Sequence, residues 1–214
     1  MKSTRKIFNL ALQTFDIEAE AITGLKALLN ADFADSVRLI YSAKGRVVIT
    51  GIGKSAIIAN KIVSTFNSTG TPAVFMHAAD AIHGDLGMIQ CDDVIICISK
   101  SGNTPEIKVL VPLLKNGGNK LIAIVGDMDS YLAANADFTL NTTVTKEACP
   151  NNLAPTTSTT AQIAMGDALA VCLLDYRGFT SVDFARFHPG GALGKKLYLR
   201  IGDLYCFPGA RPAA

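Results

Sequence analysis

Short apolar runs alternate with helix-periodic segments along residues 46–142, and this alternation constrains the fold more than any other feature. The apolar runs have the composition and length of buried strands and lie at 46–50, 73–76, 94–98, 121–125 and 138–141. Strands that alternate with helices are typical of a parallel sheet with right-handed crossovers. We therefore expect an α/β fold, a three-layer αβα sandwich around a five-stranded parallel sheet in the flavodoxin-like strand order.

Helical segments flank this core on both sides. Apolar residues recur at helical spacing up to residue 43, and residues 160–176 form a long apolar helical stretch. Residues 207–214 are rich in proline, glycine and alanine, which is typical of a disordered tail. We expect one domain over residues 1–206, made of N-terminal helices at 1–43, the sheet core at 44–142 and C-terminal helices at 143–206.

The composition excludes several classes of function. Apolar residues make up 49% of the chain and the formal net charge is +2 with no basic run, so we expect neither nucleic-acid nor membrane binding. The most apolar stretch, 161–174, is shorter than the roughly 18 residues that a membrane span requires. The five cysteines form no CxxC pair and no apolar signal segment begins the chain, so we expect reduced thiols, no bound metal and a cytoplasmic location.

The segment Ser99–Glu106 carries the clearest functional signal. It follows the apolar run 94–98 and precedes a helical segment, so its small polar residues lie between the end of a strand and a helix N-terminus. Open α/β sheets bind ligands there, where free backbone N–H groups and the helix dipole attract anions. Ser99, Ser101 and Thr104 are therefore candidate phosphate-binding hydroxyls, although an ordinary helix cap with proline in its first turn fits the same pattern.

A second loop, Gly51–Ser55, follows the first strand. Gly53 lets the backbone approach a ligand, while Lys54 and Ser55 stand at the start of the next helix. The loop is not a nucleotide-binding P-loop, because Val48 stands where that motif requires its first glycine. It also lacks the third glycine and the acidic residue of a dinucleotide site. We expect the loops after the first and third strands to form one site, because they meet at the switch point of such a sheet.

Two glutamates and two histidines are further candidates. Glu147 follows the last strand and should lie at the same sheet edge as Glu106, and paired carboxylates near a phosphate suit proton transfer beside a carbonyl. His83 is followed by glycine in a flexible stretch, and His188 precedes Pro-Gly-Gly at the start of a helix predicted over 188–196. Each of these side chains alone also fits an ordinary surface position. Their spacing matches no metal-site pattern.

Segments spread along the chain together resemble the sugar isomerase (SIS) family. The matching pieces, in order, are Gly51–Ser55, Phe66–Pro72, Ala81–Met88, Ser99–Gly102, Lys146–Pro150, Leu153–Thr160, Met165–Ala170 and His188–Gly194. The resemblance covers residues 15–204 and is strongest to the members that interconvert D-ribulose 5-phosphate and D-arabinose 5-phosphate. One such piece would carry little weight, but the ordered set is specific.

The resemblance implies an enzyme, an aldose–ketose isomerase that works through an enediol without metal or organic cofactor. Its product would supply Kdo, the eight-carbon acid sugar of lipopolysaccharide. Two alternatives are a non-catalytic sugar-phosphate-binding regulator with the same fold and an isomerase for a different sugar phosphate. A regulator needs the phosphate-binding hydroxyls of the segment Ser99–Glu106, but it does not need a lysine, two acidic residues and a histidine as well. The presence of all of these in one chain favours the enzyme.

Residue by residue, the resemblance places catalytic roles on Lys54, Glu106, Glu147 and His188, with His83 as a further active-site histidine. The phosphate-binding hydroxyls that it implies are Ser55, Ser99, Ser101 and Thr104. Lys54 would stabilise the enediolate or the phosphate. Which glutamate removes the proton, and which histidine moves the hydroxyl protons, are left open by the sequence.

The resemblance also implies a homo-oligomer, a tetramer in which a neighbouring subunit supplies the histidine that matches His188. Many relatives carry asparagine where this chain has Lys100 and a Glu-Ser-Ser run at Asn103–Pro105. The hydroxyl survives as Thr104, so we expect the phosphate site to be kept, while the sequence leaves its loop geometry open. Many relatives also continue into paired CBS domains, and we expect none here. Our hypothesis for feedback control is therefore that a nucleotide-activated sugar binds at the active site itself.

Overall fold

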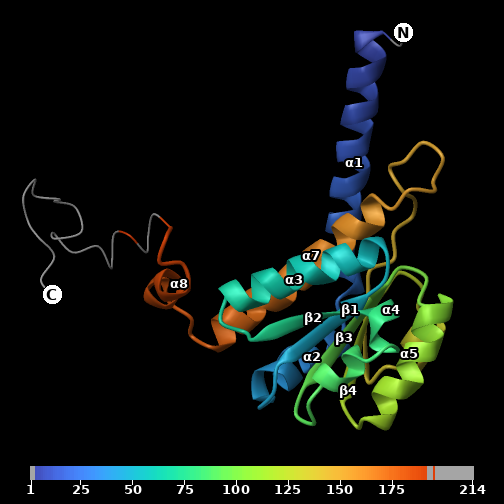
Figure 1. Ribbon diagram of the computed structural model, residues 1–214. Coiled ribbons are helices and arrows are strands. Elements are labelled where there is room, and N and C mark those ends of the chain that lie inside the picture. Colours follow the sequence, from blue (N-terminus) through green and yellow to red (C-terminus); the bar gives the residue numbers. More distant parts are fainter. Residues whose placement is uncertain (1–2, 192–194, 196–214) are drawn as a thin grey trace, which may run out of the picture.

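The structure is a computed structural model that describes residues 3–191 and residue 195 (Figure 1). Its strands are β1 Val47–Gly51, β2 Ala73–His77, β3 Val94–Ser99, β4 Lys120–Val125 and β5 Phe138–Asn141. Its helices are α1 Thr4–Leu28, α2 Ala31–Ser42, α3 Lys54–Ser68, α4 Ala78–Ala81, α5 Pro105–Asn116, α6 Tyr131–Asn135, α7 Thr157–Tyr176 and α8 Ser181–Phe187, with a 3-10 helix η1 at Asp85–Met88. Every predicted strand is present.

The strands form a parallel sheet in the order β2-β1-β3-β4-β5, which confirms the predicted flavodoxin-like topology. In register, Val47 of β1 lies between Ala73 of β2 and Val94 of β3. The chain leaves β1 in one direction and β3 in the other, so the switch point lies between the carboxyl ends of these two strands.

Successive residues of each strand point to opposite faces of the sheet and fill two separate cores. Val47 and Ile49 pack into the core covered by α2, α3 and α7, to which Phe66 of α3 and Leu169 of α7 contribute. Val48 packs on the other face, against α4, α5 and α6. Figure 1 shows these helical layers on either side of the sheet, and the predicted three-layer sandwich is confirmed.

Helix α1 packs against α7 and β5, and Leu10, Gln13 and Ile17 of α1 border a hollow that the 146–152 segment also lines. The helix projects away from the sheet (Figure 1), and apolar side chains such as Phe8 and Phe15 are exposed on it. The hydroxyl of Thr160, in the first turn of α7, donates a hydrogen bond to the Glu18 carboxylate of α1 at 3.2 Å. In the part of the chain that the structure describes, no helical segment combines the length with the hydropathy that a membrane span requires.

The C-terminal region is only partly described. Helix α7 begins at Thr157, three residues before the predicted start, and α8 ends before His188. Of the helix predicted over 188–196, residues 188–191 are described and form a turn instead, because Pro-Gly-Gly disfavours a helix there, while residues 192–194 and 196 lie outside the described residues. Cys206 and the predicted tail at 207–214 lie outside them entirely.

Candidate functional site

A cavity of about 240 Å³ lies where the loops after β1 and β3 meet the start of α7. Its lining residues are Ile52, Lys54, Ser55, Ser99, Lys100, Ser101, Thr104, Pro155, Ser158, Thr159 and Gln162. The two predicted loops therefore line one cavity, together with a third segment at the start of α7.

The loop after β3 uses part of its polar groups to hold its own shape. The Ser99 hydroxyl accepts a hydrogen bond from the Gly102 N–H at 3.0 Å, and Gly102 adopts a positive φ of 60°. The Ser101 hydroxyl accepts a hydrogen bond from the Asn103 N–H at 3.3 Å. Thr104 is the N-cap of α5, but its buried Oγ1 has no hydrogen-bond partner among the described residues. A buried hydroxyl beside a cavity and without a protein partner is suited to bind a ligand.

The charges on the cavity wall favour an anion. Lys54 and Lys100 are its only charged lining residues in the described part of the chain. Helices α3 and α5 both begin at the cavity, so their free N–H groups add to the positive potential. Gly53, the N-cap of α3, has a φ of 58°, and nothing lies within 4 Å of where its Cβ would be. The backbone there is therefore sterically open on the side where a Cβ would lie.

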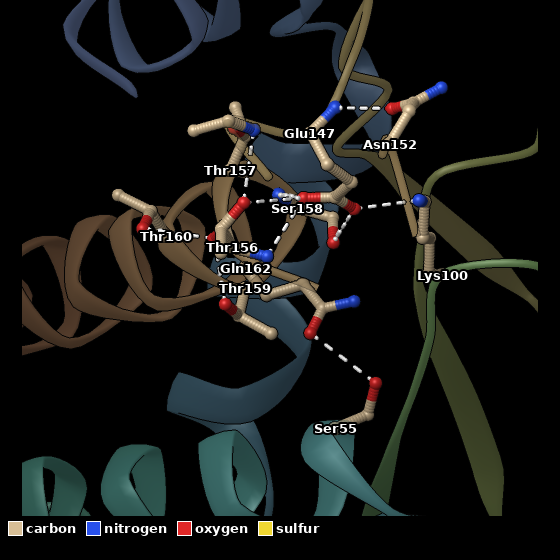
Figure 2. A network of polar contacts seen from close by, with 11 residues as sticks. Ser55, Lys100, Glu147, Asn152, Thr156, Thr157, Ser158, Thr159, Thr160 and Gln162 are labelled. Carbon is tan, nitrogen blue, oxygen red and sulfur yellow. Dashed lines mark hydrogen bonds and ion pairs between the residues drawn. The ribbon is translucent and has the colours of Figure 1, made fainter. Parts of the chain in front are cut away.

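Glu147 lies behind the cavity wall, and its carboxylate is saturated with hydrogen bonds (Figure 2). Its Oε1 accepts from the Lys100 ammonium at 2.6 Å and from the Ser158 hydroxyl at 2.5 Å. Its Oε2 accepts from the backbone N–H groups of Thr156 at 2.8 Å and Ser158 at 3.2 Å, and from the Thr156 hydroxyl at 3.2 Å. The side chain has no exposed surface. Glu147 thus occupies the N-terminus of α7 as an internal anion.

These contacts set the protonation of Glu147. Burial by itself raises the pKa of this carboxyl, but the hydrogen bonds from Lys100, from the Ser158 hydroxyl and from the α7 backbone outweigh it and lower the pKa to about 2. The group is therefore ionised throughout the physiological range. A carboxylate with so low a pKa and no free lone pair is poorly suited to accept a proton from carbon.

The lowered pKa predicts a pH dependence of stability. A carboxyl whose pKa falls from its ordinary 4.5 to about 2 on folding stabilises the protein above pH 4.5. This contribution, about 3 kcal/mol, should be lost as pH falls toward 2, because the group must then bind a proton. Urea unfolding at several pH values should show a weaker acid dependence in Glu147→Gln than in the wild type. Identical dependences in the two proteins would contradict this role of the carboxylate.

The remaining predicted residues lie at or beyond the rim of the cavity. Glu106 is half-buried in the first turn of α5, two residues after Thr104, and accepts no hydrogen bond from the described side chains. His83 is exposed just after α4, in the segment that follows β2. The structure thus places both next to the sheet edge but not in the cavity wall.

His188 lies at the far end of α3 from Lys54. It lines a separate hollow of about 530 Å³ with Asn60, Ser64 and Asn67. Its ring stacks on Phe184 at a centroid distance of 3.9 Å, and its Nδ1 lies 2.8 Å from the Phe184 carbonyl oxygen. A single chain therefore does not bring His188 to the cavity.

Sequence reasoning missed four polar residues of the cavity wall: Lys100, Ser158, Thr159 and Gln162. Ser158 and Thr159 lie in the first turn of α7, in a piece that the family resemblance matched without giving these residues a role, and Gln162 carries no signal in its local sequence. Gln162 is buried, and its Oε1 accepts a hydrogen bond from the Ser55 hydroxyl at 3.4 Å (Figure 2). Among the residues with described positions, no group of three or more His, Cys, Asp or Glu side chains could hold a metal ion.

Comparison with known proteins gives consistent matches. Residues 39–172 match the SIS domain family. The arabinose 5-phosphate isomerase KdsD of Escherichia coli K12 is 51% identical over 188 residues, which cover 88% of this chain and 57% of that protein. A protein of Haemophilus influenzae, named as a probable arabinose 5-phosphate isomerase, is 48% identical over 194 residues, 91% of this chain and 58% of its own length. The chain thus spans less than two thirds of the length of these curated relatives.

A solved structure matches over its whole length. The E. coli CFT073 protein c3406, in complex with arabinose 5-phosphate, has a TM-score of 0.84 and 39% identity, and the match covers 88% of this chain and 100% of that one.

Proposed function

This chain belongs to the SIS domain family, and we propose that it is an isomerase that interconverts D-ribulose 5-phosphate and D-arabinose 5-phosphate. The observation that carries the proposal is the cavity, where two lysines, two helix N-termini and the unpartnered Thr104 hydroxyl converge as an anion site among the described residues. The relatives named arabinose 5-phosphate isomerases, at 48–51% identity, support the choice of sugar. In bacteria that make lipopolysaccharide, this reaction would supply the synthesis of Kdo.

The proposed reaction moves a proton between two neighbouring carbons. A base removes the proton from the carbon next to the carbonyl, and the resulting enediol is reprotonated on the other carbon. Lys54, exposed at the start of α3, stabilises the negative charge that develops on oxygen. The hydroxyls of the loop after β3, with Ser55, hold the phosphate. The binding energy of the phosphate fixes the position of the sugar relative to the reacting groups.

We assign the proton-transfer base to Glu106 rather than Glu147. The Glu147 carboxylate is buried and fully hydrogen-bonded, whereas Glu106 lies beside the phosphate loop and accepts no hydrogen bond from the described side chains. His83 and His188 stay candidates for moving the hydroxyl protons. His188 would act in the site of a neighbouring subunit, since in its own chain it lies at the other end of α3.

Solvent-exchange NMR tests the function. Turnover of ribulose 5-phosphate in D₂O should place deuterium at C2 of arabinose 5-phosphate, because the enediol takes its proton from a base in exchange with solvent. A regulator of the same fold would bind the sugar phosphate without turnover. Absence of conversion, or product without deuterium at C2, would refute the enediol isomerase.

Removal of the Thr104 hydroxyl should weaken substrate binding without changing catalysis or stability. Thr104→Val keeps the shape of the side chain but removes the hydroxyl, which has no protein partner among the described residues. We expect KM to rise about 10-fold, since one hydrogen bond to a charged group is lost, with kcat and stability little changed. Steady-state kinetics and thermal unfolding check this, with Thr14→Val on α1 as the matched control. An unchanged KM would remove Thr104 from the phosphate site.

Assembly, location and control complete the proposal. A tetramer is supported by the exposed apolar side chains of α1 and by the position of His188, and sedimentation velocity tests it.

A reducing, cytoplasmic location is supported by the free thiols of Cys91, Cys97 and Cys149, and fractionation of cells tests it. Feedback by an activated nucleotide sugar at the same site predicts competitive inhibition, and its absence at millimolar concentration would end that idea.

A further inference from the structure

Lys100 is held at both its backbone and its ammonium group. Its carbonyl oxygen accepts a hydrogen bond from the Gly126 N–H at 3.0 Å, which ties it to the end of β4. Its Nζ lies 2.6 Å from Oε1 of Glu147, which joins it to the start of α7 (Figure 2). The side chain is nevertheless 49% exposed and lines the cavity.

The partner of this ion pair cannot easily move. Glu147 is buried, and the backbone and side chains of Thr156 and Ser158 hold both of its oxygens. Moving the carboxylate would break the first turn of the 20-residue helix α7. The position of the Lys100 ammonium is therefore defined by the fold, and its entropy is already reduced before a ligand binds.

The Lys100 ammonium has N–H donors that no described acceptor occupies. A lysine carries three N–H donors. Glu147 accepts from Nζ, and no other acceptor for it is found among the described residues. The other donors are available on the exposed side of Lys100, which faces the same cavity as Lys54, Ser101 and Thr104.

We propose that Lys100 is a substrate-binding residue that donates hydrogen bonds to the phosphate of the sugar, and that Glu147 is the positioning residue that holds its ammonium at the cavity. The inference rests on the proposed function in taking a sugar phosphate as the ligand. It gives the Glu147 carboxylate a role that its saturated hydrogen bonds allow, unlike proton transfer.

Calorimetric titration with inorganic phosphate and kinetics with arabinose 5-phosphate test this assignment. We expect Lys100→Met to weaken phosphate binding and to raise KM by about 10-fold or more, with a smaller effect on kcat. Lys100→Arg should recover most of the phosphate affinity, because it restores the charge. Lys115→Met, which removes an exposed charge at the other end of α5, is the control and should match the wild type.

Glu147→Gln tests the positioning role in the same titrations. We expect it to weaken phosphate binding about 3-fold, because Lys100 remains but loses its charged anchor. The double variant Lys100→Met/Glu147→Gln should bind phosphate no more weakly than Lys100→Met alone, and it leaves no unpaired buried charge to prevent folding. Additive losses in the double variant would overturn the coupling between the two residues.

The two proposals fail in different ways. Folded Lys100→Met or double variants with wild-type phosphate affinity would overturn the role of Lys100, even if the wild type is an active isomerase. A wild type that binds phosphate in a Lys100-dependent manner but does not convert arabinose 5-phosphate would refute the isomerase and leave the role of Lys100 standing.

Discussion

Glu106→Gln should lower kcat by about 10²- to 10⁴-fold while KM changes little, the largest effect expected of any single substitution in this chain. Glutamine keeps the size of the side chain but cannot accept a proton at neutral pH, so the loss should fall on the chemical step. The assignment depends on the position of Glu106 in the first turn of α5, directly after the phosphate loop. Steady-state kinetics in both directions measure the effect.

Glu147→Gln is the matched control for this prediction, because it neutralises the other candidate carboxylate. Its kcat should fall less than about 10-fold, since a saturated carboxylate with a pKa of about 2 contributes through Lys100 and α7 rather than as a base. A near-wild-type rate for Glu106→Gln, combined with a loss of 100-fold or more for Glu147→Gln, would reverse the two roles. The rate of deuterium incorporation from D₂O would then fall strongly in Glu147→Gln and stay close to the wild-type rate in Glu106→Gln.

Gly102→Ala should both destabilise the protein and disrupt the phosphate loop. Gly102 has a φ of 60°, and an added Cβ would lie 2.5 Å from the Cβ of Ser130, the buried N-cap of α6. The loop cannot move away freely, because its Gly102 carbonyl accepts a hydrogen bond from the Leu132 N–H at 3.1 Å. We expect the free energy of unfolding to fall by about 2–4 kcal/mol and phosphate affinity to fall at least about 10-fold.

An alanine substitution at a second glycine distinguishes the destabilisation caused by steric overlap from that caused by backbone strain. Gly178 also has a positive φ, of 61°, but nothing lies within 4 Å of its Cβ position. Gly178→Ala should therefore cost only about 1 kcal/mol and leave phosphate binding unchanged. Denaturant unfolding of both variants measures the difference. Equal losses of stability would show that strain alone, and not contact with Ser130, limits position 102.

Local signals in the sequence account for much of the fold. The alternation of apolar runs and helical spacing predicts all five strands, because buried parallel strands need continuous apolar residues. Thr104 and Pro105 mark the start of α5, since a capping residue and an N1 proline favour a helix there. The short helices α4 and η1, which lie on either side of His83, carry no comparable signal.

The site was predictable only where its residues follow a strand directly. Ser99, Ser101 and Thr104 could be grouped with Lys54 and Ser55 because parallel strands bring their carboxyl ends to one edge. The pairing of Lys100 with Glu147 joins positions 47 residues apart, and that of Ser55 with Gln162 joins positions 107 apart. No local pattern encodes such contacts.

By itself, the sequence determined the element order, the sheet topology and the family, because periodicity and ordered motifs are properties of the chain. Only the tertiary structure decided how the charged groups are used. It buried Glu147 at the start of α7, paired it with Lys100 and left His188 at the far end of α3. The physical reason is that burial, hydrogen-bond saturation and a shifted pKa arise from neighbours in space, and the fold brings these neighbours together from the loop after β3 and the start of α7.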